Sequence, residues 1–252
     1  MSRKLYVAAD ANGHWEDIDF SKAEKSVKKL QKRIAEACIS CNLNLLSILQ
    51  HKMIHSFYAK ALAVKIVTSK RGAKTPGVDG QIYPTTEDKY RLRSELRFRG
   101  YNPLPLKRIY IAKSNGKFRP IGIPTIKDRA MQTLIRFAIE PIYEITADNC
   151  SYAYLRNRSA KDAVASCIDI LSKNEDLRYV LKTDIKSCFD NISREWILEH
   201  TPFDKNLLSK CLNYKYVDRY GLHICDNGIP QGGCLSPMLF NMAIDGLEDT
   251  LR

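Results

Sequence analysis

Two aspartates stand six positions apart in the second half of the chain. In the run V-L-K-T-D-I-K-S-C-F-D-N-I, which starts at Val180, they are Asp184 and Asp190. The apolar residues around Val180 predict a buried β-strand from Tyr179 that ends near Asp184. A carboxylate at the end of a strand can hold a divalent metal at the rim of a sheet, where a phosphate-bearing substrate docks. An aspartate in this place is also common as a turn residue or helix cap, so the run alone leaves both interpretations open.

A second set of potential metal ligands lies nearer the N-terminus. Cys38 and Cys41 are followed by His51 and His55, and histidines at i and i+4 share one face of a helix. The gap between the two pairs is shorter than the twelve or so residues of a typical zinc finger. Both pairs also lie in amphipathic helical patterns. We therefore favour helix packing over a zinc site.

The composition limits the class of protein. The N-terminal stretch Met1 to Trp15 has no apolar core, and the apolar run Ala59 to Val67 is interrupted by Lys65. The sequence therefore predicts neither a signal peptide nor a membrane span. Eight cysteines occur without the dense spacing of a small secreted domain. We expect a cytoplasmic protein without disulfides.

The positive charge is concentrated in one segment. Residues 60–119, here called the basic segment, hold 15 basic and 4 acidic side chains, whereas the whole chain has a net charge of +12. Aromatic residues are interleaved with these charges. Because cations that neutralise phosphates release counterions, this composition favours a nucleic-acid partner. The alternative is a solvated surface.

The N-terminal region predicts helices. Ser21 and Glu24 form a capping box, after which apolar residues recur at helical spacing through Ala37. One longer helix is expected next, because an apolar stripe continues from Leu46 to Val64. The turn-rich stretch K-R-G-A-K-T-P-G-V-D-G, residues 70–80, marks the first boundary.

The remainder of the chain mixes strands and helices. A basic β-hairpin is predicted over residues 108–123, with its turn at S-N-G-K, and a second hairpin over residues 214–224. Helix starts are expected at four places: Thr125, Ser159, Ser193 and Ser236. The predicted class is α+β, divided into a helical extension (1–69), a middle region (70–178) and a last region that opens with the Asp184 strand (179–252).

Six segments together resemble the reverse transcriptases encoded by group II introns and their bacterial relatives. They are L-Q-K-R-I at Leu30, T-P-G-V-D-G at Thr75, I-A-K-S-N-G-K-F-R-P-I-G-I-P-T-I-K-D-R at Ile111, E-P-I-Y-E at Glu140, L-K-T-D-I-K-S-C-F-D-N-I at Leu181 and G-I-P-Q-G-G-C-L-S-P at Gly228. Six such pieces in the family's order form a specific signal. The resemblance implies a helical N-terminal extension, fingers that carry the basic hairpin, and an incomplete right-hand polymerase palm.

The resemblance also implies roles for individual residues. Asp184 matches the first catalytic aspartate of the palm, a ligand of two Mg²⁺ ions, and the carbonyl of Ile185 is a supporting ligand. Phe189 matches the aromatic steric gate that excludes ribonucleotides; the alternative is a plain core aromatic. Asp190 matches a position that is not a metal ligand, and we expect it to cap or pack near a turn.

Further matches concern the incoming deoxynucleoside triphosphate (dNTP). Lys113 and Arg119, on the two arms of the hairpin, match the residues that grip the triphosphate, and the alternative is contact with template phosphates. Gln231 matches a residue beside the nucleotide pocket. Gly232 and Gly233 would let the backbone approach the substrate, or would simply form a tight turn.

The sequence also departs from the family pattern. It reads S-Y-A-Y-L-R-N-R-S at Ser151, where relatives commonly read S-Y-G-F-R-P-x-R-S, and it has no Y-A-D-D-like hairpin to complete the two-metal site. We therefore expect an RNA-directed DNA polymerase that also has intron maturase activity in the intact protein, with an RNA template (intron RNA), a DNA primer and dNTPs as partners. We expect this chain alone to be inactive. The alternative is a maturase, an RNA-binding splicing cofactor without polymerase activity.

Overall fold

The computed structural model describes residues 13–114, 116–173, 179–247 and 250. The N-terminal part is helical, with η1 (Trp15–Asp17), α1 (Phe20–Ile39), α2 (Leu43–His55), α3 (Phe57–Ser69), η2 (Arg71–Lys74) and α4 (Thr86–Glu95). The middle contains β1 (Leu106–Ala112), β2 (Phe118–Ile123), α5 (Ile126–Thr146) and α6 (Ala160–Lys173). The last part contains α7 (Cys188–Asn191), α8 (Arg194–His200), α9 (Lys205–Leu212), β3 (Lys215–Asp218), β4 (Gly221–Ile224) and α10 (Ser236–Ile244). The class is α+β, as predicted.

Helix starts follow local capping, with two corrections. Thr125 caps α5 and Ser193 caps α8, each by accepting a hydrogen bond from a backbone N–H in the first turn. The cap of α1, however, is Asp19, which accepts from the Lys22 N–H at 2.9 Å, so the predicted start at Ser21 is wrong by two residues. The predicted single helix from Leu46 to Val64 is also wrong.

That helix is divided at Ser56. Its backbone is extended, with φ −64° and ψ 131°, and its hydroxyl accepts from the Ala59 N–H, so it ends α2 and caps α3. The apolar stripe continues across the break because α2 and α3 both pack against α5. The helical periodicity of the apolar residues therefore gave no sign of the break at Ser56.

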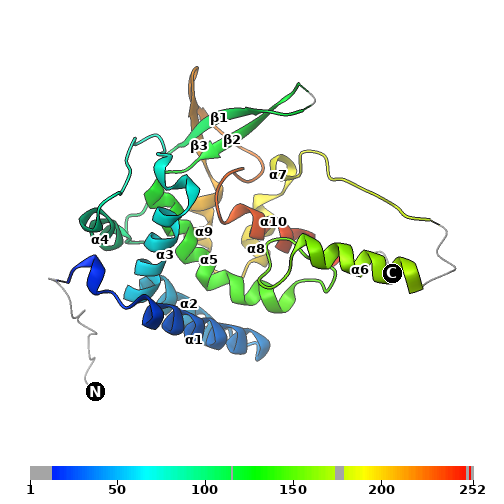
Figure 1. The fold of residues 1–252 in the computed structure, drawn as a ribbon, viewed down its shortest axis with the longest axis horizontal. Helices are drawn as coiled ribbons and strands as arrows, with labels where there is room; N and C mark the ends of the chain where they lie inside the picture. Colours follow the sequence, from blue (N-terminus) through cyan, green and yellow to red (C-terminus); the bar gives the residue numbers. More distant parts are fainter. Residues whose placement is uncertain (1–12, 115, 174–178, 248–249, 251–252) are drawn as a thin grey trace.

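The core is built around α5. This helix is buried along most of its length, and α1, α2 and α3 all pack against it (Figure 1). One hydrophobic cluster runs from Trp15 in η1 to Leu239 in α10. The N-terminal helices thus share a core with the rest of the described chain, while the division at residues 69 and 178 stays a prediction.

Both predicted hairpins form and join into one sheet, with strand order β2-β1-β3-β4. The hairpins β1–β2 and β3–β4 are antiparallel, and β1 pairs with β3 in parallel through Leu106 with Tyr216 and Lys107 with Val217. The Arg108 guanidinium stacks on the Tyr216 ring at 3.6 Å, which adds a cation–π contact at this junction.

The predicted strand at Tyr179 does not form, which is the largest correction. Residues 179–187 are irregular and pair with none of the four described strands, and Tyr179 and Leu181 are 91% and 86% exposed. Figure 1 shows this segment on the outside of the molecule, between α6 and α7. A strand needs neighbours to satisfy its backbone hydrogen bonds and cover its side chains. The described residues supply none to this segment, so its apolar composition does not produce a strand.

Helix α6, which precedes this segment, is amphipathic but has no buried residue. Among the described residues, no helix is both long and apolar enough to cross a membrane.

Candidate active site

Lys113 and Arg119 lie on the outer half of the β1–β2 hairpin. Lys113 follows β1, and its backbone N–H donates to the Lys117 carbonyl at 2.7 Å, which closes the turn. Arg119 lies on β2 opposite Ile111. Both side chains are exposed, as cations that receive a phosphate from solvent need to be.

Arg119 is joined to Gln231, although 112 positions separate them in the sequence. The Arg119 Nε–H donates to the Gln231 side-chain oxygen at 3.2 Å. The backbone reinforces this contact, because the Gly122 N–H donates to the Gln231 carbonyl at 2.8 Å. The fold thus brings two of the predicted nucleotide-binding residues to one place.

The two glycines after Gln231 serve a close approach within the protein. Gly232 has φ +117°, and a Cβ there would lie 2.2 Å from the Gly122 carbonyl oxygen. A Cβ at Gly233 would lie 2.7 Å from the Gln132 side-chain oxygen on α5. Because real Cβ contacts are longer, Gly232 requires glycine for its packing against β2, whereas a larger residue at Gly233 would force the Gln132 side chain to shift; the sequence did not reveal either contact.

Asp184 and Ile185 are not part of this assembly. Both are exposed on the irregular segment 179–187. Within the described ranges, no three His, Cys, Asp or Glu side chains gather closely enough to hold a metal ion. The described residues therefore do not fit a two-metal site, because Mg²⁺ bound close to a second ion needs several oxygen ligands.

Phe189 is half-buried on the one-turn helix α7. Its ring stacks on Phe240 of α10, with centroids 5.1 Å apart and an interplanar angle of 29°. One face of the ring thus packs on Phe240, and the residue as a whole is partly exposed. Asp190 lies beside it and is exposed. This placement is compatible with both interpretations of Phe189, the steric gate and the core aromatic.

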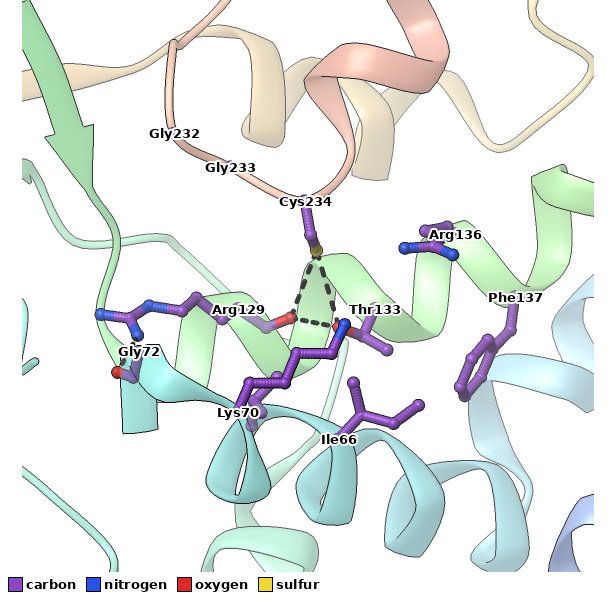
Figure 2. Close-up of a pocket in the computed structure, with 11 residues that line it drawn as sticks. Ile66, Lys70, Gly72, Arg129, Thr133, Arg136, Phe137, Gly232, Gly233 and Cys234 are labelled. Atoms are coloured by element: carbon purple, nitrogen blue, oxygen red, sulfur yellow. Dashed lines mark hydrogen bonds between the residues drawn. The ribbon is translucent and has the colours of Figure 1, made fainter. Parts of the chain in front are cut away.

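The loop that contains Gly232 and Gly233 is here called the glycine loop. A cavity of about 320 Å³ lies behind it, between α3 and α5 (Figure 2). Its wall includes three cations, Lys70, Arg129 and Arg136. Arg129 is held in place because its guanidinium donates to the Gly72 carbonyl at 2.7 Å and to the Pro124 carbonyl at 3.0 Å. Sequence reasoning missed these cations, although Arg129 lies in the family-like segment that ends in I-K-D-R.

The cavity also contains a thiol. Figure 2 shows Cys234 pointing toward α5, where its Sγ lies 3.6 Å from the Thr133 hydroxyl. Burial raises the pKa of Cys234, so the thiol is protonated and acts as a packing and weak hydrogen-bonding group.

The Cys–His pattern near the N-terminus does not form a cluster in the described structure. His51 and His55 stack with ring centroids 4.0 Å apart, and His55 Nδ1 lies 2.8 Å from the His51 carbonyl oxygen. The two cysteines do not join them in a metal-binding group among the described residues.

Comparisons with known proteins identify the family of the chain. Residues 15–96 match the N-terminal domain of reverse transcriptase, and residues 111–252 match the reverse transcriptase (RNA-dependent DNA polymerase) domain. Protein YkfC of Escherichia coli K12 is 33% identical over 205 residues, which cover 76% of this chain and 54% of YkfC. The group II intron-encoded protein LtrA of Lactococcus lactis is 32% identical over 196 residues, covering 74% of this chain and 32% of LtrA.

More distant relatives include maturase-like protein 1 of Euglena longa, which is 25% identical over 92% of this chain and 52% of that protein. The chain thus spans about half the length of YkfC and about a third of LtrA. Among solved structures, a partial Cas6-RT-Cas1–Cas2 complex aligns with 80% of this chain and 34% of that chain, at 17% identity and a TM-score of 0.46.

Proposed function

We propose a function from the premise that this chain belongs to the reverse transcriptase family. In the complete gene product, it contributes the nucleotide-binding part of an RNA-directed DNA polymerase of the group II intron type. The reaction is attack of a primer 3′-OH on a dNTP, with release of pyrophosphate. The observation that carries the proposal is the contact between Arg119 and Gln231, which places a cation and an amide together on the outer half of an exposed basic hairpin.

Each of the predicted site residues has a separate role in this reaction. Lys113 and Arg119 neutralise the triphosphate, because phosphoryl transfer depends on positioning and charge stabilisation. Gln231 borders the nucleotide, and Phe189 forms the wall that excludes a ribose 2′-OH. Asp184 is the first metal-binding carboxylate, and Mg²⁺ is the ion that the family uses. Completing that site requires further carboxylates beside Asp184.

The cavity behind the glycine loop suits the RNA template. Its cations Lys70, Arg129 and Arg136 lie next to Gly232 and Gly233, on the opposite side of that loop from the β2 strand that carries Arg119. Lys70 can hold a template phosphate there while Arg119 holds the incoming nucleotide, whereas backbone carbonyls hold the Arg129 guanidinium and Glu140 holds that of Arg136. Lys70 belongs to the basic segment, residues 60–119, which supplies further positive charge.

Primer extension on an RNA template tests the proposal. The assay compares this chain, the complete gene product and its Asp184→Ala variant, each with Mg²⁺ and with Mn²⁺. The gene product should extend the primer, and Asp184→Ala should abolish extension while leaving RNA binding intact. Extension by this chain alone that depends on Asp184 would show that its own residues complete the metal site.

A maturase without polymerase activity is the second candidate, because relatives include a group II intron-encoded protein and maturase-like proteins. A splicing assay on a cognate intron RNA separates the two. RNA splicing by a gene product that extends no primer would favour the maturase.

A further inference from the structure

The loop at residues 227–233, here called the strap, lies between β4 and α10 in the chain and contacts both α7 and β2. At one end, the Ile229 N–H donates to the Phe189 carbonyl at 2.7 Å. Gly228 has φ +68°, and a Cβ there would lie 2.3 Å from the same carbonyl oxygen. At the other end, Gln231 and Gly232 contact Gly122 of β2. The strap therefore spans the two elements that carry Phe189 and Arg119.

Helix α7 depends on the strap for its position. The segment before it is exposed and irregular, and Ser187 at its start has φ +50°, an unfavourable value for serine. Support comes from the other side, through the stacking of Phe189 on Phe240 and the hydrogen bond from Ile229. A shift of the strap would therefore shift Phe189.

Arg194 clamps the strap. The residue is 7% exposed, yet no carboxylate lies within ion-pair distance of it among the described residues. Its Nε–H donates to the Gly228 carbonyl at 2.5 Å and an Nη–H donates to the Asn227 carbonyl at 3.0 Å. The other Nη–H donates to the Asn213 side-chain oxygen at 3.3 Å. A buried cation is costly, and this one uses its planar fork to fix two consecutive loop carbonyls.

We propose that Arg194 is a positioning residue for nucleotide selection: by clamping Asn227 and Gly228 it fixes the strap, and the strap sets the position of Phe189 relative to Gln231. The part of this inference that concerns nucleotides rests on the proposed function. The part that concerns the strap does not, and it can be tested without polymerase activity. Arg194 itself touches no predicted substrate position.

Hydrogen exchange on this 252-residue chain tests the clamp. Arg194→Lys keeps the positive charge but removes the planar guanidinium with its several N–H donors, and Arg194→Gln removes both the charge and the guanidinium. Arg158→Gln is the matched control, because Arg158 also donates to three backbone carbonyls, those of Asp148, Asn149 and Ser151.

Both Arg194 variants should speed exchange at the Ile229 and Gly122 amides by about tenfold or more, because these amides bond across the two ends of the strap. The control should leave those amides at the parent rate. If Arg194→Gln does not fold, the exchange rates of the Arg194→Lys variant still test the clamp. Parent-like exchange at both amides in Arg194→Lys would overturn the clamp.

Nucleotide selection is then measured in the complete gene product. Arg194→Lys should weaken discrimination between dNTPs and ribonucleotides by about tenfold, since small misplacements of a binding wall have effects of this size or larger. In a Phe189→Val background, Arg194→Lys should have no further effect on discrimination, because the wall is already absent. Unchanged discrimination in Arg194→Lys would overturn its role in selection. A gene product that extends no primer would instead refute the proposed function, while the exchange result would still decide the clamp.

Discussion

Glu140 of α5 is the centre of a buried polar network, and replacing it with glutamine should destabilise the chain markedly. Its side chain is 3% exposed and is paired with Arg136 at 2.8 Å and with Arg156. Gln31 of α1 completes the network, because its amide donates to Glu140 at 3.4 Å and its oxygen accepts from Arg156 at 3.1 Å. The network therefore joins the N-terminal helices to the loop that follows α5.

The size of the effect follows from the exposure of the partners. Removing one member of a fully buried ion pair costs about 3–5 kcal/mol. Here the Arg136 and Arg156 side chains are 37% and 43% exposed, so water can solvate them after the loss of Glu140. The loss of charge-assisted hydrogen bonds then dominates, and Glu140→Gln should cost about 2–3 kcal/mol.

Urea and thermal unfolding of the chain measure this prediction. A loss of that size should lower Tm by about 4–12 °C in a domain of this length. Glu36→Gln is the control: Glu36 forms an i,i+4 pair with Lys32, but both side chains are well exposed, at 59% and 80%. Its loss should cost below about 0.5 kcal/mol. If Glu140→Gln were as stable as Glu36→Gln, the buried network would not hold the N-terminal helices to the core.

Three further predictions concern pH, salt and nucleotide choice. Burial raises the pKa of Asp245 from 3.8 to about 6, so the stabilising contribution of this group is present below about pH 4 and is lost as pH rises through about 6. Asp245→Asn should therefore raise Tm relative to the parent at pH 7 but not at pH 4. An equal change in Tm at both pH values would contradict this prediction. The affinity of the chain for RNA should fall by orders of magnitude between about 50 and 200 mM salt, and reversing several charges in the basic segment should weaken binding to unrelated RNAs alike. Salt-independent binding in an anisotropy titration would argue against an RNA-binding role for the basic segment. In the complete gene product, Phe189→Val should admit ribonucleotides and retain part of dNTP use, whereas parent-like discrimination would identify Phe189 as a core aromatic.

Local signals in the sequence were sufficient for the hairpins and most helix starts. The β1–β2 hairpin and the Thr125 cap depend on residues close together in the sequence, and both form as predicted, although Asn115 of the S-N-G-K turn lies outside the described residues. The break at Ser56 was missed because the apolar stripe stays in register across it, while the serine that makes the break is a single polar residue. Capping chemistry therefore outweighed periodicity at this position.

Features that depend on distant partners could not be predicted. The parallel pairing of β1 with β3 joins residues about 110 positions apart, and the clamp by Arg194 depends on a loop more than 30 positions away. The strand predicted at Tyr179 fails for the same reason. Its composition favours a strand, but the described residues provide no neighbouring strand for it.

The two halves of the candidate site are therefore stabilised by different interactions. The proposed nucleotide-binding half depends on a hairpin that folds locally and on the strap, which is held by Gly122 and Arg194 and by the close approaches at Gly228 and Gly232. The proposed metal-binding half depends on Asp184, whose segment pairs with none of the described strands. Contacts between Arg119 and Gln231 can thus form whether or not Asp184 is positioned. It follows that nucleotide binding and metal binding should be separable by mutation: changes in the strap should alter nucleotide selection, whereas changes at Asp184 should alter catalysis without disturbing the fold around Gln231.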